Sequence, residues 1–142
     1  MGRKEFISKK PYETWEFGEA IGRELSLGDL ILVTGDLGSG KTQLIKGIAK
    51  GLGVKDWIYV MSPSFTLINV YEGGKFPLFH VDLYRIRESE IDDLFVEEML
   101  DQGVVVIEWA DKARWDKYKL KITLEIMGEE ERRIVVENGL QF

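Results

Sequence analysis

The stretch that decides the fold of this chain reads Gly35-Asp36-Leu37-Gly38-Ser39-Gly40-Lys41-Thr42. It matches the phosphate-loop pattern G-x-x-x-x-G-K-[ST], in which glycines let the backbone curl so that N–H groups point at phosphate oxygens. In this pattern Lys41 reaches the β- and γ-phosphates, and the hydroxyl of Thr42 ligates Mg²⁺. The sequence therefore predicts that these eight residues bind a nucleoside triphosphate with its metal ion.

The segments on both sides of the loop have the structure that the motif requires. Residues 30–34 form a short apolar run that predicts a strand entering the loop. Residues 42–52 predict a helix leaving it, with apolar side chains three and four positions apart at Leu44, Ile45, Ile48, Ala49 and Leu52. Because the predicted strand, the loop and the predicted helix follow one another in the order that the motif requires, a nucleotide site explains the match better than an accidental glycine-rich turn does.

Composition limits the class of protein. The chain has 142 residues, a length at which we expect a single domain spanning residues 1–142. The net charge of −6 and the pI of about 4.9 argue against coating of nucleic acid, so RNA would be held mostly by a partner. The chain has no cysteine, no apolar run long enough to cross a bilayer and no signal-peptide core, which makes a cytoplasmic location without membrane contact the expectation.

The first half of the chain contains other predicted elements. Residues 4–8 read as a short edge strand, and Pro11 suits the first turn of a helix that runs to about Leu25. Its expected buried residues are Trp15, Ala20, Ile21 and Leu25. Two β-rich runs, 65–72 and 75–82, are separated by Gly73-Gly74, which is typical of a two-residue hairpin loop.

The second half of the chain completes a predicted sheet. Residues 104–109 form a continuous apolar run, which favours a parallel strand covered on both faces. Residues 119–127 alternate and turn at Gly128 into 132–137, which predicts a C-terminal β-hairpin. We therefore expect an α/β phosphate-loop NTPase fold: a mixed, mostly parallel sheet with flanking helices and the ligand at the carboxyl ends of its strands.

Two carboxylates are candidates to complete the site, since hydrolysis requires metal ligation and a positioned water. Glu108 follows the apolar residues 104–107 and can hold Mg²⁺ together with Thr42. A solvated strand-ending glutamate is the alternative, and Asp111 competes for the role although it has left the strand. Asp82 ends the second β-rich run and can orient the attacking water. Lys41, Asp82 and Glu108 are thus the predicted catalytic residues.

Three further features have two interpretations each. His80 and Arg85 flank Asp82; each can act at the phosphates or make a structural hydrogen bond or ion pair. The segment Ser62, Pro63, Ser64 and Thr66 lies where many such NTPases sense the γ-phosphate, and can equally be an ordinary Ser/Pro turn. Trp109 is a core residue or a neighbour of the nucleotide.

Four motifs in one order resemble the TsaE family, whose members are bacterial ATPases needed for threonylcarbamoyladenosine modification of tRNA. They are G-D-L-G-S-G-K-T at 35–42, S-P-S-F-T at 62–66, H-V-D-L-Y-R at 80–85 and I-E-W at 107–109. The resemblance covers nearly the whole chain. It departs at Ser64, where the family often has threonine, and at residues 9–12, which match less clearly and leave the adenine contacts open.

This resemblance implies ATP and Mg²⁺ as cofactors. Gly35 to Thr42 would hold the phosphates, and Thr42 and Glu108 the metal. Asp82 would support hydrolysis, and Trp109 would sit beside the site. Ser62 to Thr66 would respond to the nucleotide. The partners would be TsaB and TsaD, with tRNA bound through their complex. ATP hydrolysis, slow in the chain alone, would reset that complex between cycles.

Rival functions remain open from the residues. A small-molecule kinase would close an arginine-rich lid over the phosphates, and no clear lid insertion follows the loop. A GTP-dependent switch usually carries N-K-x-D, and neither Asn69 nor Asn138 begins one. A nucleotide-dependent binding switch without hydrolysis of its own is the third alternative.

Overall fold

The computed structural model describes residues 2–63, 67–87, 89–91 and 96–139. These residues form an α/β fold around a seven-stranded mixed sheet of strand order β1-β7-β6-β2-β5-β4-β3. The elements of this fold are β1 (Arg3–Ser8), α1 (Pro11–Arg23), β2 (Leu30–Gly35), α2 (Lys41–Gly51), η1 (Trp57–Tyr59), β3 (Ile68–Tyr71), β4 (Leu78–Asp82), α3 (Val96–Leu100), β5 (Val104–Glu108), η3 (Ala110–Lys112), β6 (Leu120–Ile126) and β7 (Arg132–Asn138).

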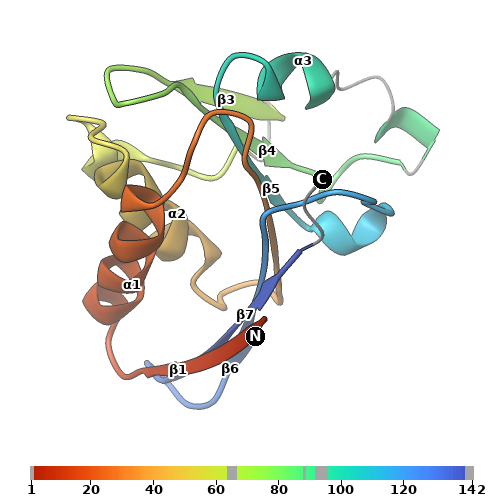
Figure 1. Cartoon of the computed structure of the whole chain (residues 1–142). Helices are drawn as coiled ribbons and strands as arrows, with labels where there is room; N and C mark the ends of the chain where they lie inside the picture. The colour runs from red at the N-terminus through yellow and green to blue at the C-terminus, as the bar shows by residue number, and fades with distance from the viewer. Residues whose placement is uncertain (1, 64–66, 88, 92–95, 140–142) are drawn as a thin grey trace.

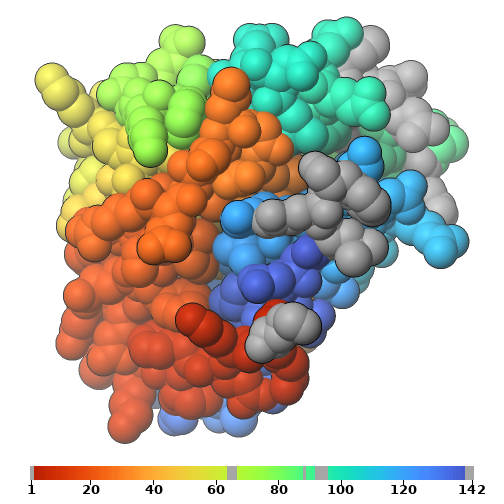
Figure 2. Space-filling view, viewed as in Figure 1, coloured from red at the N-terminus to blue at the C-terminus, as the bar shows by residue number. Residues whose placement is uncertain are grey.

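The sheet is parallel in its middle and antiparallel at both margins. Strands β6, β2, β5 and β4 pair in parallel, β3 adds antiparallel to β4, and β7 and β1 add antiparallel beyond β6. The expected fold class is confirmed, with the C-terminal hairpin β6–β7 lying between β2 and the edge strand β1. The first and last strands are therefore neighbours, and their red and blue surfaces adjoin in the space-filling view (Figure 2).

Helices cover the sheet on both faces. Helices α1 and α2 lie side by side on one face, while α3 and η3 lie on the other (Figure 1). Strands β4 and β5 are buried along their whole length, which the continuous apolar run at 104–109 predicted for β5. Alternate residues of the central strands belong to two separate cores: Ile31 and Val106 pack with α2, and Leu32 and Ile107 pack on the opposite face.

The buried face of α1 differs from the expected one. Leu25, just beyond the helix, is buried as expected, but Ala20 is exposed and Trp15 and Ile21 are half-buried. The buried positions within the helix are Thr14, Gly18 and Gly22. Two glycines of α1 meet two of α2, Gly47 and Gly51, so closely that the helix backbones touch. A Cβ on Gly18 would lie 2.2 Å from the carbonyl oxygen of Leu44, and a Cβ on Gly22 would lie 2.3 Å from that of Ile48. Periodicity missed this seam because glycine has no apolar side chain to mark it.

The hairpin β3–β4 also has a longer connection than the two-residue loop expected at Gly73-Gly74. The strands end at Tyr71 and resume at Leu78. The connecting segment packs on the end of α2 instead of turning tightly, because the N–H of Lys75 donates to the carbonyl of Leu52 at 2.6 Å. Gly74 is needed there since a Cβ would lie 2.6 Å from the same carbonyl oxygen.

Candidate functional site

The loop between β2 and α2 has the backbone of a phosphate loop. Gly38 and Gly40 have φ of 78° and 100°, a left-handed conformation that glycine adopts without strain. Gly35 has no room for a side chain, since a Cβ would lie 2.5 Å from Ser39 Oγ and 2.8 Å from the carbonyl oxygen of Leu124. The loop thus delivers the N-terminus of α2, whose first N–H groups have no partner inside the helix, to the side of a cavity.

The cavity has a volume of about 460 Å³, within the range of small-molecule sites. Its described lining residues come from the loop and the start of α2, the start of α1, the segment after η1, the ends of β4 and β5, and the β6–β7 turn. They are Pro11, Thr14, Leu37, Gly38, Ser39, Gly40, Lys41, Thr42, Gln43, Ser62, Asp82, Tyr84, Glu108, Trp109, Glu129, Glu130 and Arg132. The sheet order brings these segments together at the carboxyl ends of the parallel strands, where such folds bind ligands.

Lys41 is the buried cation of the cavity, with 6% of its surface exposed. Its Nζ donates to the carbonyl oxygens of Gly35 at 2.6 Å and Asp36 at 3.0 Å, and lies 4.3 Å from the ring centroid of Trp109. Burial lowers the pKa of Lys41, and the neighbouring carboxylates, with Glu108 and Asp82 the strongest, oppose that shift. Bound phosphate oxygens can replace these carbonyl partners and stabilise the charged ammonium.

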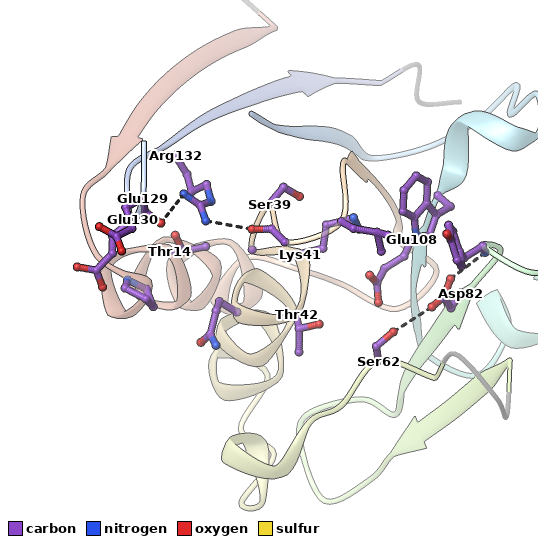
Figure 3. Close-up of a pocket in the computed structure, with 17 residues that line it drawn as sticks. Thr14, Ser39, Lys41, Thr42, Ser62, Asp82, Glu108, Glu129, Glu130 and Arg132 are labelled. Atoms are coloured by element: carbon purple, nitrogen blue, oxygen red, sulfur yellow. Dashed lines mark hydrogen bonds between the residues drawn. The ribbon is translucent and has the colours of Figure 1, made fainter. Parts of the chain in front are cut away.

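Two buried carboxylates face Lys41 across the cavity. Asp82 and Glu108 are the last residues of β4 and β5 and lie directly opposite each other in the parallel register. Asp82 accepts hydrogen bonds from Ser62 Oγ at 2.9 Å and from the N–H of Tyr84 at 2.8 Å. Figure 3 shows Glu108 between Lys41 and Asp82, so a cation bound with the phosphates can meet both carboxylates.

Glu108 has a partner that the sequence did not reveal. Its Oε2 lies 2.5 Å from Nε2 of His80, and the imidazole is fully buried on β4 beneath the carboxylate. Among the described residues, no group of three or more His, Asp or Glu side chains could hold a metal ion alone. Thr42 with one or two carboxylates could hold a hard cation such as Mg²⁺, which usually takes its remaining ligands from phosphates and water.

Aromatic rings form the wall beside the carboxylates. Trp109 follows β5 with φ of 58°, a left-handed backbone that is rare for a tryptophan and costs about 1 kcal/mol or more. This conformation sets its ring between Lys41 and the ring of Tyr84, whose centroid lies 4.8 Å away. Lys112 holds the tyrosine segment by donating to the carbonyl of Tyr84 at 2.5 Å.

The opposite end of the cavity is built by the β6–β7 turn and the start of α1. Arg132 Nη2 donates to the carbonyl of Gly38 at 3.0 Å, while Nη1 donates to the carbonyls of Gly128 and Glu131 at 2.9 Å each. Lys10 at the start of α1 pairs with Glu130 at 2.8 Å. These contacts join the turn to the phosphate loop and to α1.

The structure brings most of the predicted site residues together. Leu37 to Thr42, Ser62, Asp82, Glu108 and Trp109 line one cavity, and the carbonyls of Gly35 and Asp36 hold Lys41. Pro63, His80 and Arg85 are not among the described lining residues. Ser64 and Thr66 lie outside the described residues.

Residues 9–12, where the sequence left the adenine contacts open, reach the far end of the cavity through Pro11. Sequence reasoning missed the other residues that line this end, which are Thr14, Glu129, Glu130 and Arg132. The only local signal was a charged turn at 128–132, which is common on protein surfaces.

In the part of the chain that the structure describes, no helix is long and apolar enough to cross a membrane.

Comparisons with known proteins agree on one family. The family model "Threonylcarbamoyl adenosine biosynthesis protein TsaE" matches residues 8–135. The tRNA threonylcarbamoyladenosine biosynthesis protein TsaE of Bacillus subtilis is 39% identical over 137 residues, which are 94% of this chain and 85% of the relative. That of Aquifex aeolicus is 34% identical over 131 residues, 92% of this chain and 93% of the relative. The crystal structure of Bacillus subtilis YdiB superposes with a TM-score of 0.75 at 31% identity, covering 96% of this chain and 86% of that one.

Proposed function

The chain belongs to the TsaE family of tRNA threonylcarbamoyladenosine biosynthesis proteins, and on that premise we propose that it is a Mg²⁺-dependent ATPase serving this modification. The observation that carries the proposal is the juxtaposition in one cavity of the phosphate loop, Lys41 and two strand-end carboxylates. Nucleotide binding alone would not require buried carboxylates facing the lysine, whereas metal-assisted hydrolysis does.

Each end of the cavity suits one part of the nucleotide. The β- and γ-phosphates would lie over the loop next to Lys41, with Mg²⁺ held by Thr42 and Glu108. Asp82, fixed by hydrogen bonds from Ser62 and Tyr84, would orient the water that attacks the γ-phosphate. When bound, Mg²⁺ would neutralise the charge that develops on the phosphoryl group.

The nucleoside would lie at the far end of the cavity, against Pro11, Thr14 and the β6–β7 turn. This end is separated from the carboxylates by the phosphate loop, so an extended nucleotide with its γ-phosphate at Asp82 places its base there. Arg132 would hold the shape of this end, since its guanidinium already binds the carbonyl of Gly38.

The partners we propose are TsaB and TsaD homologues, with tRNA bound through their complex. ATP hydrolysis would reset that complex between cycles. The acidic net charge of −6 suits a protein that acts on other proteins better than one that coats RNA. A small-molecule kinase fits less well, because Arg132 is the one arginine among the described lining residues and is bonded to backbone carbonyls.

Phosphate release from ATP tests the proposal. The purified chain would be assayed with ATP and Mg²⁺, alone and with TsaB and TsaD homologues, and with GTP as a competitor. We expect slow release by the chain alone, faster release with the partners, and weak competition by GTP. Phosphorylation of an added hydroxyl compound would favour the kinase, preferred binding of GTP would favour a GTP switch, and tight ATP binding without release under any condition would favour a binding switch.

A further inference from the structure

His80 is a fully buried histidine on β4, and no step of the proposed hydrolysis uses it. Its strand position puts it two residues before Asp82 and opposite Val106, two residues before Glu108 on β5. Its side chain therefore lies on the same face of the sheet as both carboxylates, one layer below them. The ring contacts Glu108, which lines the cavity, and is not itself among the described lining residues.

One ring nitrogen of His80 makes a short contact and the other makes none. Nε2 lies 2.5 Å from Glu108 Oε2 between two side chains that are 0% and 3% exposed. Nδ1 is buried and has no hydrogen-bonding partner among the described residues. A proton on Nε2 turns the contact into a donated hydrogen bond, whereas a proton on Nδ1 would bury a donor without an acceptor.

We propose that His80 is a positioning residue for Glu108, whose carboxylate it holds in the orientation that ligates Mg²⁺. The inference rests on the proposed function, because Glu108 is a metal ligand only there. Donation from Nε2 occupies Oε2 and leaves Oε1 for the metal or its water. Glu108 could otherwise rotate toward Lys41, whose ammonium attracts the same carboxylate.

The expected size of the effect follows from metal sites in general. A residue that orients a metal ligand through a hydrogen bond changes metal affinity or activity by about 10- to 100-fold when it is removed. A residue that only fills the core would change stability and leave the dependence on Mg²⁺ as it was. The two roles are therefore separated by a measurement of Mg²⁺ dependence.

Two substitutions form a matched pair for this measurement. His80→Gln places an amide N–H₂ near the position of Nε2 and can still donate to Glu108. His80→Asn places its amide near the position of Nδ1 and does not reach Glu108. Both side chains are polar and neutral, so the difference between the variants isolates the bond.

The readout is the affinity for a non-hydrolysable β,γ-imido analogue of ATP, measured by calorimetry in EDTA and again at rising Mg²⁺. We expect His80→Asn to need about 10- to 100-fold more Mg²⁺ for half-maximal tightening, and His80→Gln to stay within about threefold of the wild-type chain. Affinity in EDTA should stay within about threefold in both variants, and thermal melts would show that they are folded.

The wild-type chain supplies a second test that needs no variant. His80 is its only histidine, so the imidazole nitrogen signals in an NMR spectrum belong to this ring. We expect the proton on Nε2. A proton on Nδ1 alone would overturn the inference, even if His80→Asn failed to fold.

Other outcomes separate the inference from the proposed function. Equal Mg²⁺ dependence in His80→Asn and wild type, or equal losses in both folded variants, would overturn the role of His80 and leave the metal site intact. A wild-type chain whose analogue affinity ignores Mg²⁺ would overturn the proposed metal site and this inference together.

Discussion

The contact between α1 and α2 makes a quantitative prediction about stability. In Gly47→Ala the new Cβ would lie 1.9 Å from the carbonyl oxygen of Trp15, about 1.5 Å short of the 3.4 Å at which ordinary contact begins. The contact is with backbone, so no side chain can rotate away, and the helices must separate. Gly51→Ala would meet the same obstacle at the carbonyl of Glu19, 2.3 Å from its Cβ.

The expected loss combines two opposing terms. Overpacking of this severity costs about 3 kcal/mol, while alanine in place of glycine stabilises a helix by about 1 kcal/mol. The net loss for Gly47→Ala is thus about 2 kcal/mol in the free energy of unfolding, or roughly 6–8 °C in Tm for a chain of this size. Since Pro11 and Thr14 of α1 line the cavity, nucleotide affinity should fall as well.

Urea denaturation followed by circular dichroism measures this loss. The control is Gly128→Ala, whose Cβ would find its nearest neighbour at 3.7 Å and whose effect should stay within about 0.5 kcal/mol. A Gly47→Ala protein as stable as the wild type, or more stable, would refute the reasoning, because the helix term alone would then account for the result.

The remaining predictions concern the cavity. Lys41→Met should weaken ADP binding by about 2–4 kcal/mol, the value of charged hydrogen bonds to phosphate, whereas Lys46→Ala on the same helix but off the cavity should not; equal effects would exclude a phosphate contact. Burial lowers the pKa of Lys41 below the usual 10.5, so the ammonium of the free chain loses its proton before the pH reaches 10.5. Metal-free ADP affinity should therefore begin to fall as the pH rises through this lowered pKa, and binding titrations of Lys41→Met should lack this fall. Glu108→Ala should slow Mg²⁺-dependent phosphate release far more than it weakens metal-free ADP binding; parallel losses would indicate a folding role. Asp82→Asn should retain ATP binding while slowing hydrolysis, and loss of binding would assign Asp82 a structural role.

The sequence alone determined the parts of this protein that depend on neighbouring residues. The phosphate loop, the strand before it and the helix after it follow from glycine positions and apolar spacing within residues 30–52. The β-rich run at 75–82 and the apolar run at 104–109 likewise predicted two strands with carboxylates at their ends, and the structure places Asp82 and Glu108 opposite each other. Periodicity has this power because it reports which face of each element is buried.

Only the tertiary structure decided which distant segments meet at the loop. The bond from His80 to Glu108 spans 28 positions, and the one from Arg132 to Gly38 spans 94. Both depend on strand order, which brings β4 beside β5 and β6 beside β2, and no local pattern encodes that order. The seam between α1 and α2 was hidden for a related reason: it is made by backbone at glycines, and hydrophobic periodicity reads side chains.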